Sequence, residues 1–194
     1  MYTNSGDYMK EEVSINISAR HVHLTKEALD ILFGHDLTVR NYLNQVGQFA
    51  ANETVTIKTA TGSIEHVRII GPIRSYNQVE ISQSDARKLG INPPVRKSGH
   101  LDNASFITIS TEKGEVSGNF GIIADRHVHF SLDDAKKYNV LDDEILHLHI
   151  QGEKPGIIDV KAKVSSDGYY EAHLDTDDAN AFLITPGDKG FLTK

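Results

Sequence analysis

The sequence predicts a mainly β protein, with β-barrels capped by short α-helices, and three observations support this fold class. Runs that mix β-branched with polar residues recur along the whole chain. Glycine-containing turns separate these runs, as at Thr61-Gly62 and Asp167-Gly168. The segments with helical character are short and lie between strands, a pattern that favours barrels over a doubly wound parallel sheet.

The predicted elements alternate along the chain in a regular order. The expected strands are Val13–Ile17, Thr54–Thr59, Glu65–Ile70, Gln78–Ile81, Phe106–Ser110, Gly121–Ala124, Glu144–Ile150, Ile157–Val164 and Tyr169–Leu174. The expected helices are Lys26–Phe33, Gln83–Leu89, Leu132–Tyr138 and Thr176–Phe182. Each helix follows a Ser, Thr or Asp, whose side chain can accept from N–H groups of the first helical turn. The polar residues 1–12 are expected to form a flexible N-terminal tail.

Composition excludes several classes of site and partner. The formal net charge is −7 over 194 residues, which argues against nonspecific nucleic-acid binding, since that relies on clustered Lys and Arg. The chain has no cysteine, so disulfides and thiolate metal sites are excluded. No apolar run approaches the ~18 residues that span a bilayer, so no membrane segment is expected. Any metal must therefore be held by carboxylates or by some of the ten histidines.

An internal repeat places histidines in a recurring context. Arg20-His21-Val22-His23-Leu24-Thr25 recurs as Arg126-His127-Val128-His129-Phe130-Ser131. Shorter versions occur at Val79-Glu80-Ile81-Ser82 and Ala172-His173-Leu174-Asp175. In all of these segments a His or Glu stands two residues before the capping residue of a predicted helix. The repeat therefore predicts strand ends that present metal-ligand side chains.

His-x-His on a strand is a usable half-site for a metal ion. Side chains two residues apart point to the same face of a strand and can converge on one ion through bonds of about 2.0–2.1 Å. The candidate ligands suit two zinc ions better than one, although copper, nickel and iron compete for imidazole-rich sites. These candidates are His21, His23, Glu80, His127, His129 and His173.

The remaining histidines lack that context. A lone His-x-His is more often solvated or hydrogen-bonded than bound to metal, and repetition with the same flanks is what favours the metal interpretation. His147-Leu148-His149 has neither the preceding Arg nor the following cap, so we interpret it as the polar face of an alternating strand. His35, His66 and His100 are isolated, and we expect surface positions or local hydrogen bonds for them.

Arg74 is a candidate anion-binding residue. Gly71-Pro72-Ile73-Arg74 follows a predicted strand and precedes Glu80. A Gly-Pro break ending in Arg can aim a guanidinium at a fixed point, and a guanidinium suits a phosphate or a carboxylate. The alternative is a structural salt bridge with one of the 27 acidic residues.

Several segments, taken together and in order, resemble the PduL-type phosphotransacylases, also called phosphate propanoyltransferases. They are Ser18-Ala19-Arg20-His21-Val22-His23-Leu24, Gln45-Val46-Gly47-Gln48-Phe49-Ala50, Gly71-Pro72-Ile73-Arg74, Gln78-Val79-Glu80-Ile81-Ser82, Pro93-Pro94-Val95-Arg96, Arg126-His127-Val128-His129 and His173-Leu174-Asp175-Thr176-Asp177-Asp178-Ala179-Asn180. The resemblance runs from about Val13 to the end of the chain, and it is the combination of segments that makes it specific.

The resemblance implies two β-barrels with short helical caps and a chain interleaved between them. Residues 13–19 and 125–194 would form one barrel, and residues 20–124 the other. A dinuclear zinc site between the barrels is also implied. One ion would be held by His21 and His23, and the other by Glu80, His127, His129 and His173.

The resemblance further implies a phosphate acyltransferase. Such an enzyme interconverts a short-chain acyl-CoA (propionyl-CoA or acetyl-CoA) plus phosphate with an acyl phosphate plus CoA. Arg74 falls at the family's phosphate-binding arginine, and the coenzyme A contacts map onto Ser18, Ala19, Arg68 and Asn180. The expected partners are acyl-CoA, phosphate and a second copy of the chain in a homo-oligomer such as a dimer, without nucleic acid or membrane.

Two features depart from the family pattern. Where the family often has Ser-Gly-Asp, this chain has Ser98-Gly99-His100, which puts any role of that acidic residue in doubt. Members found in bacterial microcompartments carry an amphipathic N-terminal targeting helix, and residues 1–12 show no clear apolar stripe. The sequence therefore predicts a cytoplasmic protein and leaves association with a microcompartment shell open.

Other functions remain open from the residues alone. The same ligands could activate water in a dinuclear zinc hydrolase of thioesters or phosphoesters. They could also stabilise a non-catalytic zinc-containing binding protein. Since no cysteine can carry an acyl group, direct transfer in a ternary complex is favoured over an acyl-enzyme, which a Glu could still form.

Overall fold

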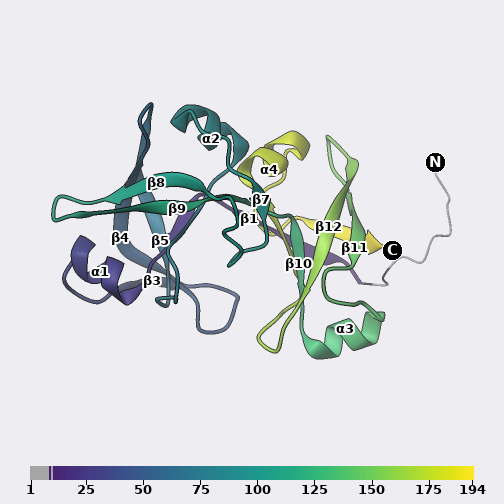
Figure 1. Ribbon diagram of the computed structural model, residues 1–194. Helices are drawn as coiled ribbons and strands as arrows, with labels where there is room; N and C mark the ends of the chain where they lie inside the picture. Colours follow the sequence, from purple (N-terminus) through teal and green to yellow (C-terminus); the bar gives the residue numbers. More distant parts are fainter. Residues whose placement is uncertain (1–8, 10) are drawn as a thin grey trace. The chain divides into compact units, whose positions relative to one another are not determined.

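In the computed structural model, which describes Met9 and residues 11–194, fourteen strands and four short helices confirm the predicted mainly β fold (Figure 1). The strands are β1 (Val13–Ser18), β2 (His21–His23), β3 (Val39–Tyr42), β4 (Phe49–Lys58), β5 (Ser63–Gly71), β6 (Gln78–Glu80), β7 (Val95–Arg96), β8 (Ser105–Ser110), β9 (Glu115–Ala124), β10 (His127–Phe130), β11 (Ile145–Ile150), β12 (Gly156–Val164), β13 (Glu171–Asp175) and β14 (Lys189–Thr193). The helices are α1 (Lys26–Leu32), α2 (Gln83–Leu89), α3 (Leu132–Tyr138) and α4 (Thr176–Phe182). None of the helices in this described part is long and apolar enough to cross a membrane.

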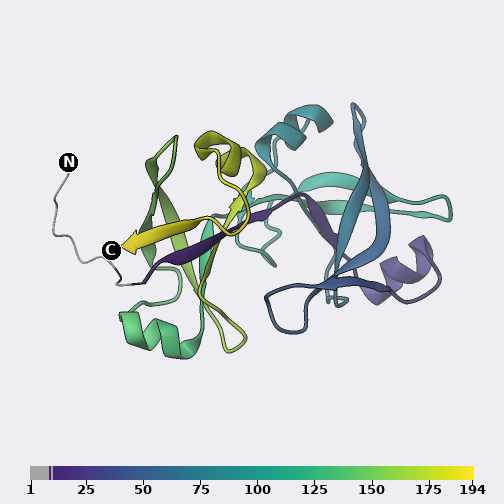
Figure 2. The same cartoon turned by 180° about the vertical axis from the view of Figure 1, so that it is seen from behind.

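The chain divides into two compact units. Unit 1 contains the described residues up to Ser18 together with Asp125–Lys194, and unit 2 contains Ala19–Ala124. The first strand and the C-terminal third of the chain thus belong to one unit, as the colours of Figures 1 and 2 show. Unit 2 is a single continuous stretch of chain.

Unit 1 is built on a closed barrel of six strands in the order β1-β13-β10-β12-β11-β14. The barrel closes because β1 pairs with β13 on one side, in parallel, and with β14 on the other, antiparallel. Alternate side chains of these strands point inward, so Ile15, Phe130 and Leu146 are fully buried in its core.

Unit 2 contains a second closed barrel, in which β4, β5, β2, β6, β9 and β8 pair in that order and β8 returns to β4. Strand β3 extends the sheet beyond β4, and the short β7 pairs with β9. Val22, Ile57 and Ile107 are among its buried core residues. Two barrels with short helices are the architecture that the family resemblance implies.

Each helix begins at the capping residue that the sequence indicates. The side chains of Thr25, Ser82, Ser131 and Asp175 accept from N–H groups of the first turns of α1, α2, α3 and α4. Ser82 and Asp85 form a full capping box. At α3, Asp134 instead accepts from the Ser131 hydroxyl at 2.6 Å. The caps fix where each ligand-bearing strand ends.

The start of the chain contributes to unit 1. Residues 1–8 and 10 of the expected N-terminal tail lie outside the described residues. Met9 is buried in the core of unit 1, and its N–H donates to the carbonyl of Leu192 at 2.9 Å. The exposed Glu11 carboxylate accepts from Lys137 and Tyr138 of α3. The chain just before β1 is therefore tied to the barrel.

Candidate metal centres

In unit 2, antiparallel pairing brings His21, His23 and Glu80 together. His21 of β2 lies directly opposite Glu80 of β6. Nε2 of His21 is 3.5 Å from Glu80 Oε2, and Nε2 of His23 is 3.8 Å from Glu80 Oε1. One potential ligand atom from each residue lies within 4.8 Å of the others. We call this group the first cluster.

Backbone carbonyls fix the two imidazoles of the first cluster. Nδ1 of His21 lies 2.9 Å from the carbonyl oxygen of Ala19, and Nδ1 of His23 lies 3.0 Å from that of Ile70. A carbonyl can only accept, so each Nδ1 carries the proton and donates. In the neutral ring this leaves the Nε2 lone pair free to face Glu80, which is how metal-binding histidines are commonly oriented.

The electrostatics of the first cluster favour a bound cation. Burial, with a further contribution from His21, lowers the pKa of His23 to about 3. Burial also acts against the charged form of Glu80, but His21 and other hydrogen-bonding neighbours outweigh it and lower the pKa of that carboxyl. The pKa of His21 is raised, because the Glu80 carboxylate outweighs the effect of burial. Glu80 therefore stays a carboxylate beside a neutral His23.

A polar network joins the first cluster to Arg74. Nε2 of Gln78 donates to Glu80 Oε1 at 2.6 Å and to Ser98 Oγ at 2.8 Å. The orientation of the Gln78 amide is fixed because its Oε1 accepts from the N–H of Gly99 at 2.7 Å, which leaves Nε2 facing Glu80. Arg74 donates from Nη1 to the Tyr76 hydroxyl at 2.8 Å and reaches Ser98 Oγ at 3.4 Å. Arg74 and Glu80 thus share Ser98 and Gln78 as intermediaries.

In unit 1, the equivalent pairing brings three histidines together. On the antiparallel strands β10 and β13, His127 lies opposite His173 and His129 lies opposite Glu171. The Nε2 atoms of His127 and His129 are only 3.1 Å apart. Ligand atoms of His127, His129 and His173 all lie within 4.8 Å of one another. We call these three residues the second cluster.

The second cluster contains a buried ring nitrogen without a hydrogen-bond partner in the described part of the chain, and two ring nitrogens that face each other. Nδ1 of His127 donates to the carbonyl of Asp125 at 2.8 Å, which leaves its Nε2 as a lone pair facing His129. Nδ1 of the buried His129 has no hydrogen-bond partner among the described residues. Burial, and then His127 and His173, lower the pKa of His129 to about 2. Two imidazoles at this spacing are arranged as ligands of one ion would be.

His173 is surrounded by polar side chains of unit 1. Its Nε2 lies 3.0 Å from the Tyr169 hydroxyl and 3.0 Å from Glu171 Oε1. Its Nδ1 lies 3.4 Å from Ser18 Oγ. Tyr169 also stacks on the His129 ring, with centroids 5.0 Å apart and an angle of 13° between the planes. The ring of His173 is therefore held on both of its nitrogens.

The donor sets of both clusters fit zinc. Zinc binds imidazole and carboxylate ligands, usually four of them in a tetrahedral arrangement. Its filled d shell imposes no coordination geometry of its own. Each cluster offers three protein ligands, as catalytic zinc sites do when a fourth position is left for water or substrate. The resemblance groups Glu80 with the three histidines of the second cluster, whereas the contacts that Glu80 makes inside unit 2 are with His21 and His23.

The residues expected to contact coenzyme A fall in both units. In unit 1, Ser18 lies against His173, and Asn180 is exposed on α4. In unit 2, the carbonyl of Ala19 holds His21. Arg68 lies opposite His21 on the parallel strand β5, and its Nη1 donates to the carbonyls of Ala51 and Asn52 at 2.9 Å. Three of these four residues therefore lie beside a candidate ligand. Ser18 lies near His173, the Ala19 carbonyl accepts from His21, and Arg68 is the strand partner of His21.

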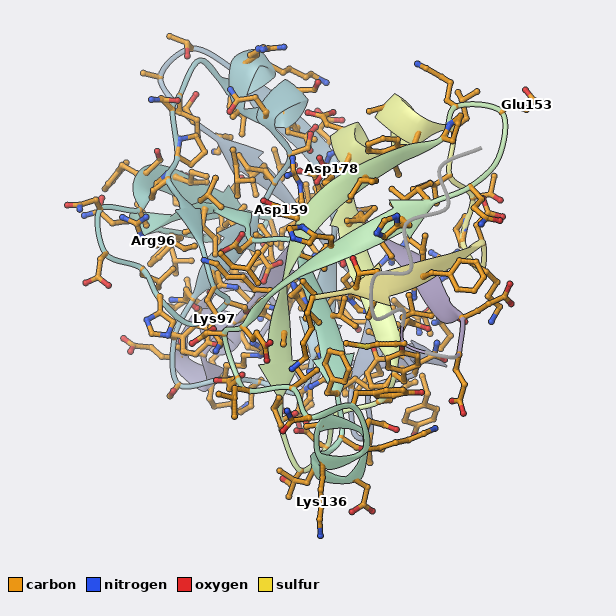
Figure 3. All side chains as sticks on the ribbon, turned by 90° about the vertical axis from the view of Figure 1, so that its right-hand side faces the viewer. Arg96, Lys97, Lys136, Glu153, Asp159 and Asp178 are labelled. Carbon is orange, nitrogen blue, oxygen red and sulfur yellow. The ribbon has the colours of Figure 1, made fainter. Side chains whose placement is uncertain are left out.

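The histidines that the sequence did not indicate as metal ligands belong to neither cluster. On β11, Leu146 and Leu148 point into the core while His147 and His149 are partly exposed, as an alternating strand requires. Nδ1 of His147 lies 2.8 Å from Asp159 of β12, a residue labelled in Figure 3. Nε2 of His149 lies 2.9 Å from Thr193 Oγ1. Of the isolated histidines, His35 is exposed and contacts the carbonyl of Asp36, and His66 and His100 are exposed.

The residues that surround the candidate ligands were not predicted from the sequence. Gln78 and Glu171 each stand two positions before a single ligand, Glu80 or His173, and both are buried. The signal was present in the repeat, because a residue two positions earlier on a strand points to the same face. Tyr169 was expected to begin a strand, but β13 starts only at Glu171. Tyr169 and Ser98 therefore both lie outside the strands, where no periodic pattern indicates which way a side chain points.

Comparison with known proteins identifies similar chains over almost the whole length. The family model described as phosphate propanoyltransferase matches residues 14–185. A phosphate propanoyltransferase of Priestia megaterium is 46% identical over 185 residues, covering 93% of this chain and 85% of that protein. Its counterpart in Thermotoga maritima is 42% identical over 187 residues, covering 94% of this chain and 89% of the relative. A third, from Clostridioides difficile, is 42% identical with the same coverage over 186 residues.

Proposed function

Since this chain belongs to the phosphate propanoyltransferase family, we propose that it is a phosphate acyltransferase acting on short-chain acyl-CoA. It would interconvert propionyl-CoA or acetyl-CoA plus phosphate with the acyl phosphate plus CoA. The observation that carries this proposal is the position of Arg74, whose guanidinium reaches Ser98. Ser98 accepts from Gln78, which also donates to the metal-ligand candidate Glu80.

We also propose that the two clusters each hold a zinc ion. His21, His23 and Glu80 would hold one, and His127, His129 and His173 the other. When bound, zinc would supply Lewis acidity that stabilises the negative charge developing on the thioester oxygen and on the departing sulfur. The carbonyl-bound Nδ1 atoms of His21, His23 and His127 direct the opposite ring nitrogen of each toward another candidate ligand of its cluster.

Arg74 would bind and orient the incoming phosphate. Within the described residues, all hydrogen bonds of its guanidinium come from Nη1, and it forms no ion pair with a carboxylate. Nε and Nη2 are therefore available for a two-bonded contact with phosphate. The Tyr76 hydroxyl and Ser98 limit the orientations of the side chain, so that it is positioned before phosphate arrives.

The reaction is a direct acyl transfer in this proposal. A phosphate oxygen attacks the thioester carbonyl carbon, the new C–O bond forms, and the C–S bond breaks as coenzyme A leaves as the thiolate. No cysteine is present to accept the acyl group, so a ternary complex of both substrates is sufficient. Ser18, Ala19, Arg68 and Asn180 would contact coenzyme A, as the family resemblance implies.

A phosphate-dependent thiol-release assay tests the proposed function. Protein of measured metal content is mixed with acetyl-, propionyl- or butyryl-CoA, with and without phosphate, and free thiol and acyl phosphate are both quantified. We expect thiol release only with phosphate, matched by acyl phosphate. Thiol release without phosphate would identify a hydrolase instead, and no turnover of any acyl-CoA would favour a binding protein. His147→Ala serves as the control for histidine replacement, because this residue lies in the unrelated doublet on β11.

A further inference from the structure

We propose that Glu171 is a positioning residue that fixes the imidazole of His173 for metal binding, an inference that rests on the proposed zinc function. Glu171 precedes His173 by two positions on β13, so both side chains leave the same face of the strand. Glu171 Oε1 lies 3.0 Å from His173 Nε2. No sequence pattern for a metal site drew attention to this carboxylate.

The carboxylate of Glu171 is itself held in place. The residue is only 7% exposed. Nδ2 of Asn16, on the neighbouring strand β1, donates to the same Oε1 atom at 3.1 Å. Asn16 in turn accepts from the N–H of Ile17 at 2.8 Å, which sets the orientation of its amide. A chain of hydrogen bonds from β1 therefore fixes the oxygen that faces His173.

The repeat provides an independent argument. In unit 1, Glu171 lies opposite His129, and His173 lies opposite His127. In unit 2, Gln78 lies opposite His23, and Glu80 lies opposite His21. Glu171 and Gln78 therefore occupy the same position relative to their clusters. Both contact the single ligand two residues later.

The two positions carry opposite hydrogen-bonding chemistry, matched to their ligands. Glu80 is a carboxylate that accepts, and its neighbour Gln78 donates an N–H to it. His173 is an imidazole whose ring N–H can donate, and its neighbour Glu171 is an acceptor. If the two positions only filled space in the barrel, this match between neighbour and ligand would not be needed.

A carboxylate on one imidazole nitrogen has a defined effect on the other. It fixes the proton on the nitrogen that it contacts, holds the plane of the ring, and makes the remaining nitrogen a stronger ligand. Among the described residues, the group of mutually close ligand atoms comprises His127, His129 and His173 and does not include Glu171. Glu171 thus acts on the metal through His173.

The test compares zinc affinity in three variants of the full-length protein. Glu171→Leu removes the acceptor, Glu171→Gln keeps the shape and a neutral acceptor, and Glu144→Gln is the control. Glu144 also accepts hydrogen bonds in unit 1, from Leu141 and Lys194, but it is not part of the second cluster. Metal-free protein is titrated with zinc against a chromophoric chelator, and its thermal melting is recorded in parallel.

We expect one of the two zinc affinities to fall by about 10- to 100-fold in Glu171→Leu, and by less in Glu171→Gln. The other affinity, and both affinities of Glu144→Gln, should match those of the wild type. Wild-type affinity in both Glu171 variants would overturn the inference, even if their metal-free melting temperatures fall, since that pattern means a purely structural carboxylate. A wild-type protein that binds no zinc would refute the metal part of the proposed function instead, so the two failures are distinguishable.

Discussion

Arg20 and Asp85 form an ion pair with two contacts, from Nε to Oδ2 at 2.9 Å and from Nη2 to Oδ1 at 2.7 Å. Arg126 and Asp178 repeat it in unit 1, at 2.8 and 2.9 Å. In both units the arginine directly precedes the histidine doublet, and the aspartate lies in the first turn of the helix that follows the single ligand. Each ion pair therefore connects the start of the strand with the histidine doublet to the helix that follows the strand with the single candidate ligand. Asp178 is labelled in Figure 3.

Removing Arg20 should destabilise unit 2. Arg20→Ala leaves the buried Asp85 carboxylate without its cation, although the arginine itself is 44% exposed, so the expected loss is about 1–3 kcal/mol of unfolding free energy. Urea denaturation of the metal-free protein measures it. Arg87→Ala, an exposed position on the same helix, is the control and should stay within about 0.5 kcal/mol of the wild type. Equal stabilities for the two variants would mean that the ion pair contributes nothing.

Purified protein should contain close to two zinc ions per chain. His21→Ala removes a ligand from the first cluster and His127→Ala one from the second, so each should lose about one ion and nearly all activity. Elemental analysis and the thiol-release assay measure the two effects. His147→Ala and His149→Ala should keep both ions and near-normal turnover. Full activity in protein stripped of every transition metal would rule out the two-zinc proposal.

Arg74→Ala should impair the use of phosphate. The lost charge-assisted contact is worth roughly 1.5–3 kcal/mol, which predicts a ten- to hundredfold rise in the phosphate KM or fall in kcat. Arg74→Lys should restore activity only in part, because it keeps the charge but loses the planar fork. Steady-state kinetics with phosphate varied measure both.

Metal content and a matched variant separate this role from a structural one. Zinc content should not change in Arg74→Ala, since Arg is not a ligand, and Arg40→Ala, an exposed arginine on β3, should behave as wild type. A variant with a lower melting temperature but normal phosphate kinetics would show that Arg74 is a structural residue.

The attachment of the N-terminal segment should depend on pH. Hydrogen bonds from Lys137 and then Tyr138 hold the pKa of Glu11 below its ordinary value of 4.5. A lowered folded pKa means that the contribution to stability is present above the ordinary pKa and is lost as pH falls through the folded pKa. Hydrogen exchange at the Met9 amide, corrected for its intrinsic rate, should therefore speed up from pH 6 to pH 3. Glu11→Gln should reduce this dependence, and an unchanged dependence in the variant would exclude Glu11 as the titrating group.

Helices were predicted more accurately from the sequence than strands. The bounds of α2, α3 and α4 agree with the sequence analysis because each begins at a capping residue. Helix α1 ends at Leu32, one residue earlier than predicted. Local sequence marks a helix start, so these bounds need no tertiary information.

Strands that are determined by pairing with neighbouring strands, and not by their local sequence, were missed or predicted too short. Strand β14 contains Gly190, where an added Cβ would lie 2.8 Å from Leu148 Cδ1 and 2.9 Å from the carbonyl oxygen of His149. Glycine is required there by close approach to β11, which the local sequence cannot reveal. The first half of β9 was missed as well, because Gly118 and Asn119 have low strand propensity.

For the candidate site, the repeat alone indicates the six candidate ligands that lie in the two clusters. It could not pair them, because pairing depends on strand register, which places Glu80 opposite His21. The spacing of two positions places Gln78 and Glu171 on the same strand faces as Glu80 and His173, but the roles of these neighbours appear only when the registers of the two barrels are compared.

The interleaved chain sets an order in which the two clusters can be completed during synthesis. All residues of the first cluster, and all strands of its barrel, lie between Ala19 and Ala124. That barrel can close while the rest of the chain is still being translated. Strand β1 must wait, since its partners β13 and β14 are the last strands to emerge. If the two clusters hold zinc as proposed, a nascent chain released from the ribosome before Glu171 would be able to bind the first ion but not the second.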